Sequence, residues 1–219
     1  MKKRIALILT GTMLMGLALS ACGDNEGTAK NAEKTESSVE TSSNANNRST
    51  FTVGFDAEYP PYGYMDENGE YTGFDLELAE AVCKLEGWEL VKKPINWDAK
   101  DMELNSGSID CIWNGFTMNG REDEYTFSTP YVDNSQVIVV AEDSGINTLE
   151  DLAGKTVGVQ AASAALELLQ SDEKDGQKAL ADTFGALNEF ADYNTAFTEL
   201  QAGALDALAI DFGVANYQI

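Results

Sequence analysis

The chain has 219 residues, 43% of them hydrophobic and 23% charged, which is enough to build one large domain or two smaller lobes. Its 37 acidic and 14 basic residues give a formal net charge of −23, which argues against nucleic acid as a partner. Because the chain contains no histidine, catalytic triads, histidine-bound metals and imidazole acid–base chemistry are excluded.

Residues 1–21 have the pattern of a signal peptide. A basic start at residues 2–4 is followed by an apolar stretch at 5–19, which is short for a transmembrane helix of about 20 residues. The stretch ends in Leu19-Ser20-Ala21-Cys22, which resembles the lipobox of bacterial lipoproteins. This resemblance implies cleavage before Cys22 and attachment of a lipid to its sulfur. The alternative is an ordinary secretory signal in which Cys22 is incidental.

Residues 22–50 are expected to form a disordered tether behind the lipidated cysteine. Ser, Thr, Asn, Glu and Ala dominate this segment and only Val39 is strongly apolar, so it cannot bury a core. A flexible coil of this length reaches on the order of 30 Å. We therefore expect a folded domain held at the cell membrane, on its extracytoplasmic face.

Residues 51–133 are expected to form a first lobe. Strand patterns alternate with helix patterns, which predicts a mainly parallel sheet with helices on both faces. Asn68-Gly69 marks a turn, and Gly87 is the expected end of the first helix. That helix carries Leu78, Ala81, Val82 and Leu85 at helical spacing. The expected strands are 51–55, 88–91 and 109–113, and the expected helices are 75–86 and 97–106.

Residues 134–219 are expected to form a second lobe, joined to the first around 131–136. Its helix at 163–170 has Ala165, Leu166 and Leu169 on one side. Only residues 211–219 follow the last strand, so we expect this lobe to be incomplete with an open sheet edge. The expected strands are 136–141, 156–159, 187–190 and 205–210, and the other expected helices are 148–152 and 195–202.

Two cysteines remain if Cys22 is lipidated. Cys83 lies in a helix pattern and Cys111 in a strand pattern. One alternative is a disulfide between them, formed in an oxidising exterior, and the favoured interpretation is a reduced buried pair.

Arg121 is the sole arginine of the expected lobes, since Arg4 and Arg48 lie in the signal peptide and the tether. A guanidinium binds a carboxylate through two parallel hydrogen bonds, a geometry that lysine cannot reproduce. Arg121 follows a predicted strand, where loops of α/β sheets carry ligands. The alternative is a local ion pair with one of the acids at 122–124, and the spacing does not decide between the two.

Eight segments of the chain form a series of motifs, among them Tyr59-Pro-Pro-Tyr62 and Phe127-Ser-Thr-Pro-Tyr131. The segments are 51–55, 59–62, 73–80, 97–98, 104–110, 127–131, 149–160 and 200–211. In this order they resemble the family 3 extracellular solute-binding proteins, the polar amino-acid receptors of ABC importers. The resemblance implies an α/β fold of the periplasmic-binding-protein-like type II, with two lobes around a ligand cleft and neither cofactor nor metal.

The resemblance also implies how the α-carboxylate of an amino acid would be bound. Arg121 matches the arginine that clamps the carboxylate. Gly115 and Thr117 match strand-end positions that add hydrogen bonds, and Ser163 falls at a helix start that donates to the same group.

The rest of the ligand is matched by four further residues. Asp211 matches the carboxylate that takes the α-ammonium, Tyr59 and Trp97 match the aromatic positions that sandwich the side chain, and Asp56 matches an acid near its tip. Burying either charge of a zwitterion unpaired costs several kcal/mol, so one fixed cation and one fixed anion suit such a ligand. The alternatives are that Asp211 caps the following helix and that both aromatic residues are ordinary core.

The chain departs from the family pattern in three places. The loop Met118-Asn-Gly120 before Arg121 is one residue shorter. Residues 161–164 replace a glycine- and hydroxyl-rich turn, so Ala162 lacks the freedom of glycine at positive φ and Ala164 lacks a hydroxyl. The family also continues for several tens of residues beyond position 219.

The sequence thus predicts a lipid-anchored, monomeric binding protein that captures a polar amino acid, delivers it to an ABC permease and catalyses nothing. One alternative is a dehydratase or murein-cleaving enzyme on the same scaffold, with Asp56 or Glu58 as general acid. The other is the ectodomain of a membrane sensor.

Overall fold

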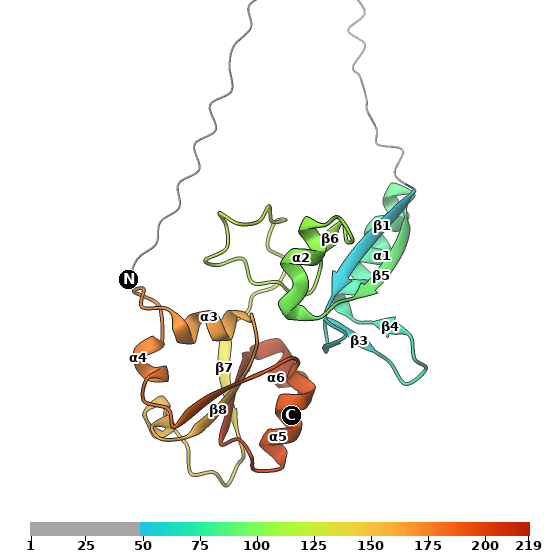
Figure 1. Cartoon of the computed structure of the whole chain (residues 1–219). Helices are drawn as coiled ribbons and strands as arrows, with labels where there is room; N and C mark the ends of the chain where they lie inside the picture. Colours follow the sequence, from blue (N-terminus) through green and yellow to red (C-terminus); the bar gives the residue numbers. More distant parts are fainter. Residues whose placement is uncertain (1–48) are drawn as a thin grey trace, which may run out of the picture. The chain divides into compact units, whose positions relative to one another are not determined.

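A computed structural model describes residues 49–219, which lie within one compact unit. Within this range the strands form a three-stranded sheet, a four-stranded sheet and a small three-stranded hairpin sheet (Figure 1). The expected signal peptide, Cys22 and nearly all of the expected tether lie outside the described residues.

The three-stranded sheet has the order β5-β1-β6, and both outer strands run parallel to β1. This confirms the predicted strand–helix–strand–helix–strand order. Strand β6 is shorter than expected, although the residues on either side of it still pair with β1: Asp110 N donates to Thr52 O, and Trp113 N donates to Gly54 O. The elements are β1 (Thr50–Phe55), α1 (Phe74–Glu86), β5 (Glu89–Pro94), the 3₁₀ helix η1 (Trp97–Ala99), α2 (Lys100–Asn105) and β6 (Cys111–Ile112).

The buried face of α1 is not formed by the four apolar residues noted at helical spacing in the sequence. The helix buries Leu76, Ala79 and Cys83 against the sheet, whereas Leu85 is 85% exposed. Apolar residues occupy two faces of this helix, so periodicity alone did not identify the face that packs on β1. The apolar residues noted at helical spacing are therefore not the buried ones: Leu78 and Val82 are half-buried, and Ala81 and Leu85 are exposed. The predicted end is confirmed, because Gly87 adopts a left-handed conformation with φ of 71°.

The hairpin sheet lies in a segment that was expected to be loop and turn. Its strands β2 (Glu58–Tyr59), β3 (Gly63–Met65) and β4 (Tyr71–Thr72) pair antiparallel. The predicted turn at Asn68-Gly69 is confirmed, since Asp66 accepts hydrogen bonds from Asn68 N and Glu70 N. Strands of two or three residues are too short to show an alternating pattern.

The four-stranded sheet has the order β7-β10-β8-β9, in which β8 runs parallel to both neighbours and β7 is antiparallel to β10. All predicted elements of this part are confirmed, and two short helices, α4 and α6, were missed. The elements are β7 (Gln136–Val140), the 3₁₀ helix η2 (Leu149–Leu152), β8 (Thr156–Gln160), α3 (Ala164–Gln170), α4 (Lys178–Ala181), β9 (Ala186–Phe190), α5 (Tyr193–Gln201), β10 (Ala207–Asp211) and α6 (Phe212–Gln218).

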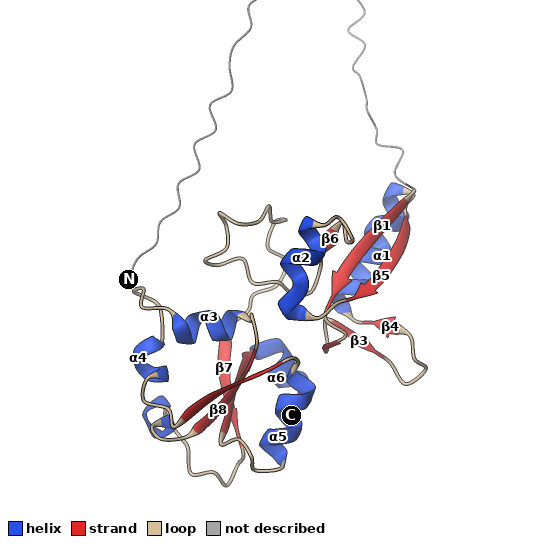
Figure 2. Ribbon diagram, viewed as in Figure 1, coloured by secondary structure: helices blue, strands red, loops and turns tan. Residues whose placement is uncertain are grey.

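Helices cover both faces of this sheet (Figure 2). Successive side chains of a strand point to opposite faces, so Ala207 and Ala209 of β10 pack in the core beneath α3 and α4. Leu208 and Ile210 pack in a second core with α5 and α6. The predicted buried side of α3, formed by Ala165, Leu166 and Leu169, is confirmed.

Cys83 is buried and forms no disulfide, which confirms the reduced state expected for it. Burial raises the pKa of its thiol. Cys111 is only half-buried, in β6.

Candidate functional site

Residues from the ends of several strands meet at one small cavity. Its volume is about 10 Å³, which is room for about one water molecule. All but one of the residues assigned to the ligand by resemblance line it, together with Asn114, Phe116, Gln160 and Ala164. The assigned residues in the lining are Tyr59, Trp97, Gly115, Thr117, Arg121, Ser163 and Asp211.

Arg121 is buried at this cavity, with 4% of its surface exposed. Its Nε and Nη2 donate to Oε1 of Glu167 on α3 at 3.1 and 2.5 Å, and its Nη1 donates to the carbonyl oxygen of Thr117 at 3.1 Å. The guanidinium also lies 4.7 Å from the centre of the Phe116 ring. The ion-pair partner is thus a distant acid and not one of those at 122–124. These contacts fix a cation at the cavity.

The loop between β6 and Arg121 shapes one wall. Gly115 has a φ of +57°, a conformation that favours glycine. Arg121 N donates to Met118 O at 2.9 Å, so the short loop forms a tight turn just before the arginine. The hydroxyl of Thr117 accepts a hydrogen bond from Asn134 Nδ2 at 3.4 Å.

Asp211 supplies the negative charge of the cavity. It is buried at the end of β10, and its Oδ1 accepts a hydrogen bond from Gln136 Nε2 at 2.7 Å and another from Asn134 Nδ2. Asp211 holds the N-cap position of α6, yet its side chain makes no capping hydrogen bond. The capping alternative is therefore wrong. Neutral amides leave the negative charge of the carboxylate uncompensated, which suits a cationic partner.

The two aromatic residues line the cavity and are held by contacts of their own. Tyr59 stacks on Tyr62 at 5.4 Å between ring centres. Burial, and then the charge of Asp211, raises the pKa of the Tyr59 phenol. Trp97 packs edge-on against Phe116 at 5.4 Å, and its Nε1 donates to the carbonyl oxygen of Ala162 at 3.2 Å.

Asp56 lies beside the cavity but does not line it. Its Oδ2 accepts a hydrogen bond from Gln160 Nε2 at 2.6 Å, and its Oδ1 accepts one from Glu58 N at 2.8 Å. Burial raises the pKa of the Asp56 carboxyl to about 6. Gln160 therefore connects the predicted side-chain acid to the cavity.

In the turn before α3, Ala162 occupies a position of positive φ where, as noted in the sequence, it lacks the conformational freedom of glycine. This residue adopts a φ of 53°, which costs a residue with a Cβ about 1 kcal/mol or more. Its carbonyl oxygen accepts from Trp97 Nε1 and from Lys100 Nζ at 3.3 Å. Ser163 caps α3 by accepting a hydrogen bond from Leu166 N at 3.2 Å.

Sequence reasoning gave no role to Lys100, Gln160 or Glu167. Lys100 is 4% exposed, and burial lowers the pKa of its ammonium group. Glu167 lies in the first turn of α3, four residues after Ser163. The sequence did contain a signal for Glu167, because this acid lies one helical turn after Ser163, which was expected to bind the ligand carboxylate.

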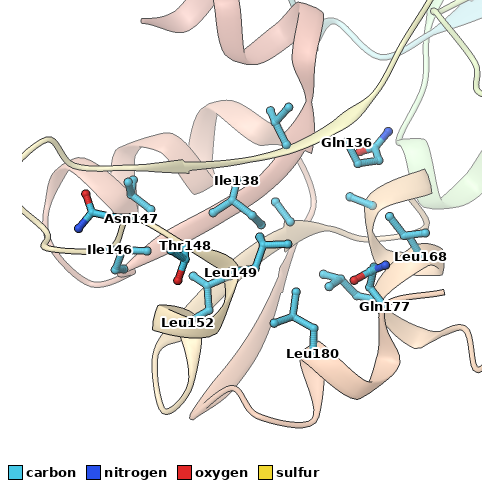
Figure 3. Close-up of a pocket in the computed structure, with 15 residues that line it drawn as sticks. Gln136, Ile138, Ile146, Asn147, Thr148, Leu149, Leu152, Leu168, Gln177 and Leu180 are labelled. Carbon is cyan, nitrogen blue, oxygen red and sulfur yellow. The ribbon is translucent and has the colours of Figure 1, made fainter. Parts of the chain in front are cut away.

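A much larger cavity of about 640 Å³ lies elsewhere, among β7, η2, α3 and α4 (Figure 3). Apolar side chains such as Ile138, Leu152 and Leu180 line it, with Gln136, Asn147, Thr148 and Gln177 as its polar members. No charged residue lines this cavity among those that the structure describes. It cannot neutralise a zwitterion and is not the candidate site.

Comparisons with known proteins place the chain among binding proteins. A family model for bacterial extracellular solute-binding proteins, family 3, matches residues 51–209. The chain is 32% identical over 167 residues to the L-cystine-binding protein TcyJ of Escherichia coli K12, which covers 75% of this chain and 59% of that protein. The chain thus spans less than two thirds of the length of this relative.

Solved structures with the same fold include a substrate binding protein of an ABC uptake transporter from Streptococcus pneumoniae with bound histidine. The two structures match with a TM-score of 0.73 and are 36% identical in sequence, and the match covers 78% of this chain and 69% of that protein. The ancestral amino acid-binding protein AncCDT-1, a precursor of cyclohexadienyl dehydratase, gives a TM-score of 0.70 at 32% identity, over 77% and 73% of the two chains. These likenesses confirm the predicted type II α/β fold.

Proposed function

Because the chain belongs to the bacterial extracellular solute-binding proteins, family 3, we propose that it captures a free amino acid outside the cell and delivers it to an ABC permease. The relative and the solved neighbours described above are named for binding amino acids or as parts of an ABC transporter. We propose that the residues around the small cavity form the amino-acid site, between lobes at 51–133 and 134–219.

The observation that carries this proposal is that a buried cation and a buried anion line one cavity. Arg121 would bind the α-carboxylate through two parallel hydrogen bonds, and Asp211 would accept from the α-ammonium. Each ligand charge would be paired as it leaves water, which avoids a cost of several kcal/mol. Gly115, Thr117 and Ser163 would add hydrogen bonds to the carboxylate.

The side chain of the ligand would lie between Tyr59 and Trp97. Gln160 and Asn114 line the same cavity as these rings, and Gln160 donates a hydrogen bond to the Asp56 carboxylate. This polar surrounding favours an amino acid with a polar side chain. Ligand contacts from both lobes would favour a closed state, and the permease would recognise that state.

The test is isothermal calorimetry of the full chain against the common amino acids and cystine, after a thermal-shift screen selects the ligand. Arg121→Ala should abolish binding, and Arg121→Lys should weaken it by at least about tenfold because lysine lacks the two-pronged geometry. Lys174→Ala, which removes an exposed cation, is the matched control and should bind normally. Unchanged affinity of Arg121→Ala would refute the carboxylate assignment.

We further propose that the protein is monomeric. We also propose that it is anchored to the membrane through a lipid on Cys22. Residues 49–219 include no helix with the length and apolarity needed to cross a membrane. Replacing Cys22 by Ala should move the protein from the membrane fraction to the medium or the periplasm. Retention of the variant in the membrane fraction would contradict the anchor.

We propose that the protein has no catalytic activity, although one neighbour is described as the precursor of a dehydratase. Asp56, with its pKa raised to about 6, is the acid that an enzyme would use. Incubating the protein with candidate cyclohexadienyl substrates should give no product. Turnover that disappears in Asp56→Asn would overturn this proposal.

A further inference from the structure

The position assigned to the ligand carboxylate already holds a carboxylate of the protein. Glu167 Oε1 accepts from both Nε and Nη2 of Arg121, along one of the two edges on which a guanidinium binds a carboxylate through two hydrogen bonds. At the other edge, Nη1 donates to the carbonyl oxygen of Thr117. The remaining cavity has room for about one water molecule. An amino acid cannot enter unless Glu167 leaves Arg121.

The two partners of this ion pair differ in how firmly they are held. The side chain of Arg121 is 5% exposed, and it is fixed by the carbonyl oxygen of Thr117 and the ring of Phe116. The side chain of Glu167 is 51% exposed. Glu167 can therefore turn into solvent and regain its hydration, whereas Arg121 would be left buried without an anion.

A second cation lies close to the same carboxylate. The charge of Glu167 acts on the Lys100 ammonium, which is also influenced by Arg121, Asp98 and Asp101. Lys100 Nζ donates to the carbonyl oxygen of Ala162 in the turn before α3. Two buried cations thus favour an anion at this point, and Glu167 provides it when no ligand does.

We propose that Glu167 is an internal competitor of the ligand, whose carboxylate occupies Arg121 in the empty protein and sets the affinity for amino acids. This inference rests on the proposed function, because it assigns the displaced position to the ligand carboxylate. An incoming amino acid exchanges one carboxylate for another at Arg121. The binding free energy then contains only the difference between the two contacts, plus the contacts made by the rest of the ligand.

The test combines two measurements on the full chain. The first is calorimetric titration of wild type and Glu167→Gln with the amino acid found by the screen. Glu167→Gln keeps the shape of the side chain but removes its charge, and should bind about five- to tenfold more tightly because its contact with Arg121 is weaker. Glu173→Gln removes the same negative charge from another exposed residue, in the loop after α3, and should bind like wild type.

The second measurement is a double-mutant cycle of Arg121→Gln and Glu167→Gln, read by urea unfolding without ligand. A favourable coupling is expected in the ligand-free protein. A coupling of zero would overturn the contact, and a Glu167→Gln affinity equal to or weaker than that of wild type would overturn the competition. Binding of no amino acid by any variant, wild type included, would instead refute the proposed function.

Discussion

We predict that the carboxyl group of Asp75 makes the stability of this protein depend on pH. Its side chain is fully buried at the start of α1, where Oδ1 accepts a hydrogen bond from Tyr131 Oη at 2.8 Å. Its Oδ2 has no hydrogen-bond partner among the described residues. Burial raises the pKa of the Asp75 carboxyl from 3.8 to about 6. The protonated form is therefore favoured in the folded state.

The sign of the effect follows from proton uptake. Between pH 4 and pH 6 the folded state binds more protons at Asp75 than the unfolded state, so stability falls as the pH rises. The stabilising contribution is fully present below the unfolded pKa and is lost above the folded one. A pKa difference of about 2 corresponds to about 3 kcal/mol, or about 6 to 12 °C in the melting temperature of a domain of this size.

We predict that Asp75→Asn removes this dependence. Asparagine can still accept from Tyr131 but carries no charge at any pH. Its amide adds a buried donor, so the absolute stability is a poor readout, and the difference between pH 4 and pH 7 is the quantity to compare. Urea unfolding at both values should show that wild type loses about 3 kcal/mol more than the variant on going to pH 7. Equal losses in both proteins would refute the reasoning.

Two other predictions concern the backbone and the packing. Ala162→Gly should raise the melting temperature by about 1 to 4 °C, because relief of the left-handed conformation outweighs the added entropy of the unfolded chain; a lower melting temperature would show that this turn is not strained. Leu76→Ala should cost about 2 to 5 kcal/mol in urea unfolding, whereas Leu85→Ala should cost less than about 0.5 kcal/mol; the reverse order would show that α1 packs through its other apolar face.

Much of the fold could be predicted because its longer elements obey simple periodic rules. Strands β8 and β10 and helix α3 showed their patterns in the sequence, and the structure confirms them. The buried face of α1 could not be predicted, because the helix is apolar on two sides and tertiary contact with β1 decides between them. The antiparallel pairing of β7 likewise depends on a connection that no local pattern describes.

The site was predictable where a residue type is rare or follows a strand. Arg121 was found in this way and Asp211 by the family resemblance, and the structure brings both to one cavity. Glu167 and Lys100 escaped because charged residues on helices usually face solvent. Their position at the cavity depends on contacts between segments far apart in the chain, such as Lys100 with Ala162. The roles of Arg121 and Asp211 as ligand contacts stay proposals.

The central claim is that Arg121 and Asp211 neutralise the two ends of one small zwitterion, and ligand chemistry tests it most directly. Once the screen has identified an amino acid, calorimetry should compare it with its carboxamide, which lacks the carboxylate, and with its N-acetyl derivative, which lacks the ammonium. We predict that each modified compound binds at least about a hundredfold more weakly. Affinity within about twofold of the parent amino acid for either compound would contradict the claim.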